Sequence, residues 1–128
     1  MAQAANRRTV AVVEDDAPSR NALGRLLRAG GFEPALFDSA EAFIEAPPRA
    51  PLCLILDVNL TGMSGTDLQG RLRRAGSSTP IIVTTALHDA CIRDRAEENG
   101  CTAFLWKPFN SSTLLSLLGA IAQDPTDY

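Results

Sequence analysis

The residues of greatest chemical interest stand at the carboxyl ends of short apolar runs of the chain. They are Glu14-Asp15-Asp16, Asp57, Thr84-Thr85 and Lys107. In an open parallel sheet, ligands bind in the crevice beyond the carboxyl ends of the strands. If the four apolar runs form neighbouring parallel strands, these polar side chains converge on one pocket at that edge of the sheet.

The residue types in this set fit metal-assisted phosphoryl transfer. Carboxylates as close together as those of Glu14, Asp15 and Asp57 would repel each other unless a cation lay among them. Oxygen ligands without histidine or thiolate suit Mg²⁺. The Thr85 hydroxyl and the Lys107 ammonium are donors for phosphoryl oxygens. Asp57 would be the nucleophile that becomes an aspartyl phosphate, with the metal and the lysine offsetting the charge of transfer.

Lys107 is notable for a second reason, because it is the one lysine among 12 basic residues. Where arginine is the default cation, a retained lysine indicates a position that needs a compact ammonium on a flexible stem rather than a planar guanidinium. A chance occurrence is the alternative at this point.

The apolar runs alternate with segments that have helical spacing. The runs cover residues 9–13, 32–37, 52–56, 81–84 and 103–106. Five strands, each followed by a helix, predict an α/β fold with a parallel sheet and helices on both faces. The third run is continuously apolar, which is typical of a central strand, whereas Pro34 lacks a ladder donor and suits an edge strand.

Capping and helix-breaking residues bound the expected helices. The helices begin near Pro18, Ser39, Gly65, Asp89 and Ser111 or Ser112, and the first four end near Gly30, Pro47, Gly76 and Asn99. One domain over residues 9–122 contains all of these elements. We expect an N-terminal extension at residues 1–8 and a C-terminal tail at residues 123–128.

The composition is that of a single globular domain. The chain has 128 residues, of which 45% are hydrophobic and 21% charged, and its formal net charge is −3. This length suffices for one core, and the charge balance does not suggest direct nucleic-acid binding. No apolar run approaches a membrane span of about 18 residues, and the N-terminus shows no secretory signal, so we expect a cytoplasmic domain without membrane contact.

Several other reactive or charged side chains are assigned no chemical role. The apolar neighbours of the three cysteines favour buried or nearly buried free thiols over disulfides or a metal site. The single histidine and one arginine cluster are expected to be solvated. These residues are Cys53, Cys91, Cys101, His88, Arg71, Arg73 and Arg74.

Five short segments carry the polar residues and stand in a characteristic order. They are VVEDD at 12–16, LDVNL at 56–60, MSG at 63–65, VTTA at 83–86 and KPF at 107–109. With these segments, the chain resembles the receiver domain of bacterial two-component response regulators over about residues 9–122. It is most similar to receivers of the nitrogen-fixation regulator type, for which SAEAF at 39–43 is an additional match. The resemblance implies a flavodoxin-like, doubly wound fold with strand order 2-1-3-4-5.

The resemblance also implies the roles of the metal-site residues. Asp57 is the phosphoacceptor and a Mg²⁺ ligand. Asp15 is a direct ligand, Glu14 acts through a water molecule, and the backbone carbonyl of Asn59 supplies a further protein ligand.

Three further roles follow from the same resemblance. Thr85 is the hydroxyl residue of the site, because the small residue Ala86 follows it and leaves room for the phosphoryl donor. Lys107 forms an ion pair with a phosphoryl oxygen. Phe104 takes the place of the switch aromatic, with ordinary core packing as the alternative.

Two positions depart from the family pattern. Glu14 stands where aspartate is more common. Thr61 stands where the family usually has proline, four residues after the phosphoacceptor. From the second departure we expect a looser loop after the third strand but no loss of a chemical group.

The implied function is that of a signalling switch. A sensor histidine kinase or a phosphotransfer protein would phosphorylate Asp57, and the modified state would shift a pre-existing equilibrium. The affected face comprises the helix after Asp89, the strand at 103–106 and the last helix, and it is a candidate homodimer interface. Trp106 would lie on this face, in a partner surface or in plain packing. Such a domain catalyses its own phosphorylation and dephosphorylation but is not a turnover enzyme.

Three other classes fit the sequence less well. A haloacid-dehalogenase-type phosphohydrolase also uses aspartate, threonine, lysine and Mg²⁺, but its second aspartate is replaced by Asn59, and the acidic cluster precedes the nucleophile. The complete residue set argues against an interaction module without phosphorylation. Dinucleotide binding is disfavoured because no GxGxxG follows the first strand.

Overall fold

A computed structural model describes residues 8–123 and shows a five-stranded parallel sheet in the order β2-β1-β3-β4-β5. The strands are β1 (Thr9–Val13), β2 (Glu33–Phe37), β3 (Cys53–Asp57), β4 (Ile81–Thr85) and β5 (Ala103–Trp106). The helices are α2 (Ala17–Ala29), α3 (Ala40–Glu45), α4 (Gly65–Arg74), α5 (Ala90–Glu98) and α6 (Ser111–Ala122). The predicted fold and strand order are therefore confirmed. The expected terminal segments 1–8 and 123–128 lie almost entirely outside the described residues.

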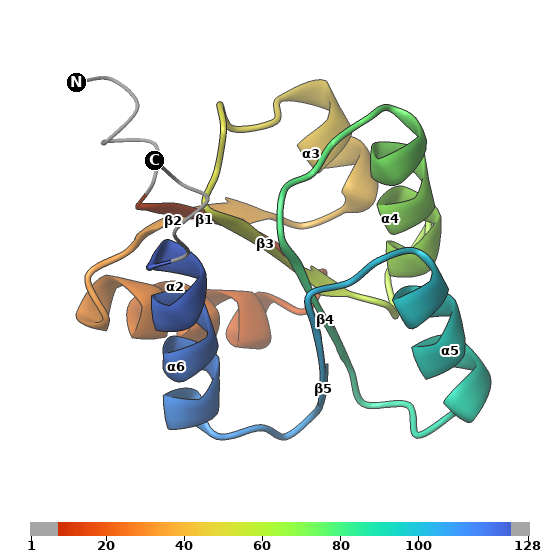
Figure 1. The fold of residues 1–128 in the computed structure, drawn as a ribbon. Coiled ribbons are helices and arrows are strands. Elements are labelled where there is room, and N and C mark those ends of the chain that lie inside the picture. Colours follow the sequence, from red (N-terminus) through yellow and green to blue (C-terminus); the bar gives the residue numbers. More distant parts are fainter. Residues whose placement is uncertain (1–7, 124–128) are drawn as a thin grey trace.

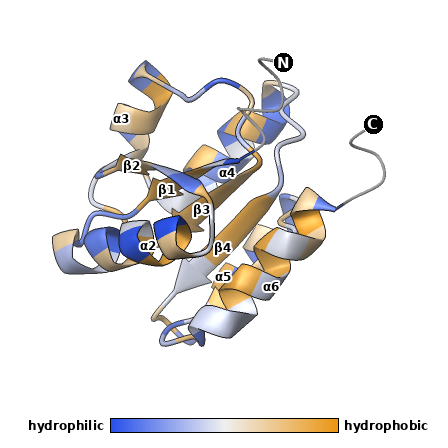
Figure 2. Ribbon diagram, turned by 90° about the vertical axis from the view of Figure 1, so that its left-hand side faces the viewer, coloured by the Kyte–Doolittle hydropathy of each residue, from blue (hydrophilic) through white to orange (hydrophobic). Residues whose placement is uncertain are grey.

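The helices cover both faces of the sheet, with α2 and α6 on one side and α3, α4 and α5 on the other (Figure 1). Successive residues of a strand point to opposite faces, so β1 sends Val10 and Val12 into the core under α2 and α6, and Ala11 and Val13 into the core on the other side. The strands form an apolar layer between the helices (Figure 2). Strand β3 is buried along its whole length, as predicted for a central strand.

Side-chain caps fix where four of the helices begin. Asp16, Ser39, Ser64 and Asp89 each accept a hydrogen bond from a backbone amide in the first turn of α2, α3, α4 and α5, respectively. Such caps satisfy amides that have no partner within the helix. The helix starts expected from the sequence thus agree with the structure to within about one residue.

The strands confirm one prediction about the sheet and differ from another in their length. Among the strands of residues 8–123, β2, which contains Pro34, pairs with β1 alone and is an edge strand, as predicted. Strands β3 and β4 each extend one residue beyond the expected apolar run, because Asp57 pairs with Thr84 and Thr85 pairs with Trp106. The polar residues at these ends therefore belong to the sheet and are held by its ladder.

The cysteines differ from one another in exposure. Cys53 is buried in β3 and Cys101 is half-buried, but Cys91 is exposed. The expectation of a core or nearly core position was wrong for Cys91, because this residue lies at the start of α5, where the fully buried residue is Ala96. No helix within residues 8–123 has the length and apolar character needed to span a membrane.

Candidate functional site

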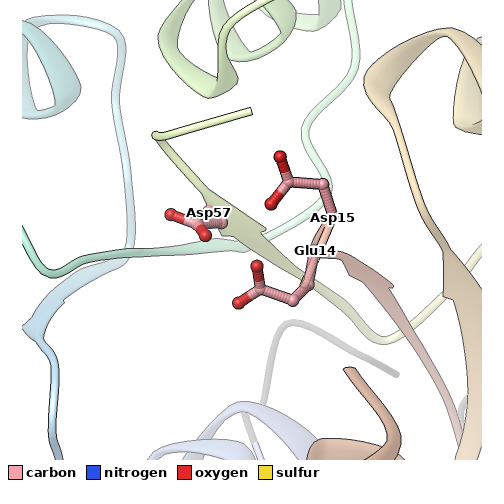
Figure 3. A group of neighbouring side chains, drawn as sticks. All are labelled: Glu14, Asp15 and Asp57. Carbon is pink, nitrogen blue, oxygen red and sulfur yellow. The ribbon is translucent and has the colours of Figure 1, made fainter. Parts of the chain in front are cut away.

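Three carboxylates meet at the carboxyl edge of the sheet. Glu14 and Asp15 follow β1, and Asp57 ends β3. One oxygen from each of these residues lies within 4.8 Å of the others. Figure 3 shows the three side chains gathered around one space beyond the strand ends. Glu14 and Asp57 are buried, whereas Asp15 is exposed.

Both carboxylate oxygens of Asp57 accept a hydrogen bond. Its Oδ1 accepts from the backbone amide of Asn59 at 3.0 Å, and its Oδ2 accepts from Nζ of Lys107 at 3.1 Å. The residue is only 5% exposed. These contacts fix the orientation of the carboxylate and leave its remaining lone pairs free for another group.

Glu14 is the most deeply buried of the three acids and shares Lys107 with Asp57. Its Oε1 accepts from Nζ of Lys107 at 2.5 Å, and its Oε2 accepts from the Asp16 amide at 3.3 Å. Burial, reinforced by the neighbouring Asp57, raises the pKa of Glu14 to about 6 against the opposing effect of Lys107. The site thus concentrates negative charge in a poorly solvated place, which favours a bound cation.

Lys107 remains a cation in this environment. Its burial disfavours the charged form, but the hydrogen bonds and charges of Glu14 and Asp57 outweigh this effect and raise the pKa of the lysine above its ordinary value. The lysine lies at the end of β5, and its backbone amide donates to the Thr85 carbonyl at 2.7 Å. This bond ties the lysine to the end of β4.

The donor set fits a small, hard divalent cation. Three carboxylates with oxygens this close together are suitable ligands for Mg²⁺, which prefers oxygen ligands and retains several waters. The Asn59 amide contributes indirectly by orienting Asp57. The ligand role expected for the Asn59 carbonyl stays a prediction.

The loop between β3 and α4 is held by carboxylates at three points. The Asn59 amide bonds Asp57, Thr61 bonds Asp15 through both its amide and its hydroxyl, and the Met63 amide bonds Glu41. The expectation of a looser loop is not supported. Proline has no N–H and no hydroxyl, so Thr61 adds two donors that the usual residue would lack.

Thr85 is fully buried, and its hydroxyl is engaged with its own loop. The Thr85 Oγ1 accepts from the Leu87 amide at 3.0 Å. Among the described residues, no hydrogen bond joins Thr85 to Asp57. Ala86 lines an open groove of about 590 Å³ together with Glu14 and Lys107, so the site can be reached from that side.

Phe104 and Trp106 lie on the same face of β5 and touch each other. Their ring centroids are 4.9 Å apart with an edge-to-face angle of 75°. Phe104 packs against the core on the α3, α4 and α5 side, as the core-packing alternative predicts, and its switch role stays a prediction. Trp106 is half-buried, and His88 stacks on its ring at 4.5 Å. His88 is exposed as expected, but this stack was not foreseen.

Sequence reasoning missed Arg20, which supports the acidic loop. Its Nη1 donates to the carbonyl of Glu14 at 2.9 Å and to that of Asp15 at 3.4 Å. A cation in the first turns of a helix opposes the helix dipole. An arginine near the start of α2 is therefore unfavourable for the helix itself. This unfavourable position was the signal in the sequence that could have indicated another role for Arg20.

The fold and the site together define a doubly wound α/β domain with an acidic pocket at the carboxyl edge of its sheet. A family model described as the response regulator receiver domain matches residues 10–119. The chain belongs to this family.

Two curated relatives show the same relationship. The chain is 38% identical to Nodulation protein W of Bradyrhizobium diazoefficiens over 94% of its length and 54% of that protein. It is 35% identical to the transcriptional regulatory protein FixJ of the same organism over 84% of its length and 53% of that protein. The chain thus spans about half the length of the curated relatives it matches.

The solved structures agree. A crystal structure of FixJ-N matches with a TM-score of 0.82 and 30% identity, and the match covers 91% of this chain and 94% of that one. The response regulator StyR matches with a TM-score of 0.83 and 39% identity, over 93% of this chain and 61% of that one. The resemblance to the nitrogen-fixation regulator type is confirmed.

Proposed function

We propose that this domain is a phosphorylation switch in which Asp57 accepts a phosphoryl group from a sensor histidine kinase or a phosphotransfer protein. The observation that carries the proposal is the double contact of Lys107 with Asp57 and Glu14 beside a third carboxylate. This arrangement places a nucleophilic oxygen, a compact cation and a set of metal ligands around one space. The proposed place of action is the cytoplasm.

The proposed step is a displacement at phosphorus. A carboxylate oxygen of Asp57 forms a new O–P bond as the P–N bond of a phosphohistidine breaks, and the departing imidazole nitrogen keeps the electron pair and takes up a proton. The protein contributes mainly position and charge, because the transferred group carries its charge on three peripheral oxygens. Lys107 already points at Asp57 and can follow one of these oxygens.

The remaining residues prepare the site for that charge. When bound, Mg²⁺ supplies a positive charge that offsets both the carboxylates and the transferred group. Glu14 and Asp15 would hold it together with Asp57. Arg20 holds the backbone of the acidic loop in place through its carbonyls.

The switch would begin at Thr85. Its hydroxyl can donate to a phosphoryl oxygen on Asp57, but turning toward that oxygen removes the acceptor of the Leu87 amide. The residue after Leu87 is His88, which stacks on Trp106. Phosphorylation would thereby alter the face formed by α5, β5 and α6, where Phe104 is the candidate switch aromatic and where a homodimer or another partner can bind.

The decisive experiment is incubation with acetyl phosphate and Mg²⁺, followed by intact mass spectrometry. We expect a single phosphoryl adduct that requires Mg²⁺ and is missing in Asp57→Asn. An adduct that persists in this variant, or no adduct at all, would overturn the proposal. Sustained hydrolysis of p-nitrophenyl phosphate would instead indicate a turnover phosphohydrolase, whereas a switch is expected to modify itself without net turnover of such esters.

A further inference from the structure

The exposed member of the acidic triad, Asp15, is held from a second loop. Its Oδ2 accepts the backbone N–H and the hydroxyl of Thr61, each at 3.2 Å, across 46 positions of sequence. In the part of the chain that the structure describes, the Asp15 carboxylate accepts no other hydrogen bond. Thr61 therefore determines the orientation of this side chain.

The hydrogen bonds of the residues on either side of Thr61 show that its own position is fixed. Two residues before it, the Asn59 amide bonds the Asp57 carboxylate at 3.0 Å. Two residues after it, the Met63 amide bonds Glu41 at 2.9 Å. The donors that hold Asp15 thus belong to a loop anchored on both sides, and one of the anchors is the phosphoacceptor itself.

Holding an exposed carboxylate matters for cation binding. A free aspartate side chain samples several rotamers, and ordering it upon binding costs free energy. Here the two bonds from Thr61 favour one orientation of the Asp15 carboxylate before the cation arrives. A carboxylate offers about four lone-pair sites, so the two bonds from Thr61 leave others for a metal. One Asp15 oxygen lies within 4.8 Å of oxygens of both Glu14 and Asp57.

We propose that Thr61 is a positioning residue for the divalent cation and that its two donors hold Asp15 in the ligating orientation and so strengthen Mg²⁺ binding. The inference rests on the proposed function, because it presupposes that Asp15 is a Mg²⁺ ligand. A proline at this position would provide neither donor.

Three substitutions separate the contributions of the two donors. Thr61→Val keeps the branched shape and the N–H but removes the hydroxyl, Thr61→Pro removes both donors, and Thr61→Ser restores the hydroxyl. Thr102→Val is the matched control, because it makes the same change at an exposed residue just before β5, at the opposite edge of the sheet. Mg²⁺ affinity is measured by isothermal titration calorimetry, and folding by circular dichroism without metal.

Loss of groups that orient metal ligands commonly weakens metal binding by about 10-fold to 100-fold. We expect a weakening of about 10-fold in Thr61→Val and a larger one in Thr61→Pro. Affinity should return to within about 2-fold of the parent in Thr61→Ser and stay unchanged in Thr102→Val. Serine carries the hydroxyl group that valine lacks. Recovery of Mg²⁺ affinity in Thr61→Ser, but not in Thr61→Val, therefore separates positioning of Asp15 from a general loss of loop structure.

Two results would overturn this inference while leaving the proposed function intact. Unchanged affinity in Thr61→Val and Thr61→Pro would mean that Asp15 needs no support from this loop. Tighter binding in Thr61→Val would mean that Thr61 draws Asp15 away from the cation. If the parent protein itself binds no Mg²⁺, the proposed function fails, and the inference fails with it.

Discussion

The ammonium group of Lys107 lies 3.1 Å from Oδ2 of Asp57, although the two residues are 50 positions apart in the chain. The same Nζ atom also bonds Glu14, and the lysine side chain is 24% exposed. One compact group thus serves two carboxylates in a confined space. A guanidinium, which is planar and donates in a fixed fork, cannot reproduce this geometry.

We therefore expect Lys107→Arg to fold normally and still accept a phosphoryl group while losing the conformational response. The adduct is detected by intact mass, and the response by amide NMR spectra recorded with and without acetyl phosphate and Mg²⁺. Arg25→Lys, at an exposed position of α2, is the control for exchanging one cation for the other. A normal spectral response in Lys107→Arg would mean that the single lysine has no special role.

The single tryptophan provides an optical test of the proposed coupling between Asp57 and the α5-β5-α6 face. Because Leu87 donates to Thr85 and its neighbour His88 stacks on Trp106, movement of Thr85 should disturb the stack. We expect the emission of Trp106 to change when acetyl phosphate and Mg²⁺ are added. The change should be missing in Asp57→Asn and reduced in Thr85→Ala. An equal change in all three proteins would contradict this route.

Gly65 permits α4 to begin directly against the end of β3, which carries the proposed phosphoacceptor Asp57. A Cβ atom at this position would lie 2.2 Å from the backbone oxygen of Asp57, and backbone cannot yield as a flexible side chain can. We expect Gly65→Ala to lower the free energy of unfolding by about 1–3 kcal/mol, as overpacking does, and to displace Asp57. Urea denaturation measures the first effect, and the rate of adduct formation measures the second.

Gly119 is the matched control for that substitution. It also lies in a helix, but a Cβ atom there would meet nothing within 4 Å. Gly119→Ala should raise stability by up to about 1 kcal/mol, because alanine has the higher helix propensity. Equal destabilisation by the two substitutions would show that the close approach to Asp57 is not the cause.

The three thiols should differ in reactivity according to their surroundings. Burial raises the pKa of Cys53 to about 12 and, with a contribution from Glu97, raises the pKa of Cys101. A raised pKa leaves less thiolate at neutral pH, and the thiolate is the nucleophile. Because Cys91 is exposed, we expect iodoacetamide to label it first, Cys101 slowly and Cys53 only after unfolding. Peptide mapping by mass spectrometry identifies the order, and labelling of native Cys53 would contradict it.

The strands and the main site residues could be predicted from the sequence because they depend on local patterns. An apolar run followed directly by a charged residue, as at Asp57, marks both the strand and the point where it reaches the sheet edge. Parallel strands bring their carboxyl ends together, so the convergence of Glu14, Asp57 and Lys107 follows from topology.

The features that could not be predicted depend on which loops approach each other. Thr61 bonds a carboxylate 46 positions away, and no local pattern specifies that pairing. The stack of His88 on Trp106 likewise requires the loop after β4 to lie over β5. Cys91 has apolar neighbours but faces solvent, because the rotation of α5 about its axis is set by packing around Ala96.

The three neighbouring carboxylates lead to a prediction about stability in the absence of phosphorylation. Their oxygens lie within 4.8 Å of one another, and within the described residues the Lys107 ammonium bonds Glu14 and Asp57 but not Asp15. A cation that binds the folded state and not the unfolded chain stabilises the fold by mass action, which amounts to about 2.7 kcal/mol at a concentration of 100 times the dissociation constant. Urea denaturation with Mg²⁺ should show this gain, whereas NaCl at matched ionic strength should give little of it, because general screening does not need a site. In Asp57→Asn the Mg²⁺ gain should shrink, since one ligand charge is lost. An equal gain from NaCl, or an undiminished gain in Asp57→Asn, would mean that the cation does not bind among these three residues.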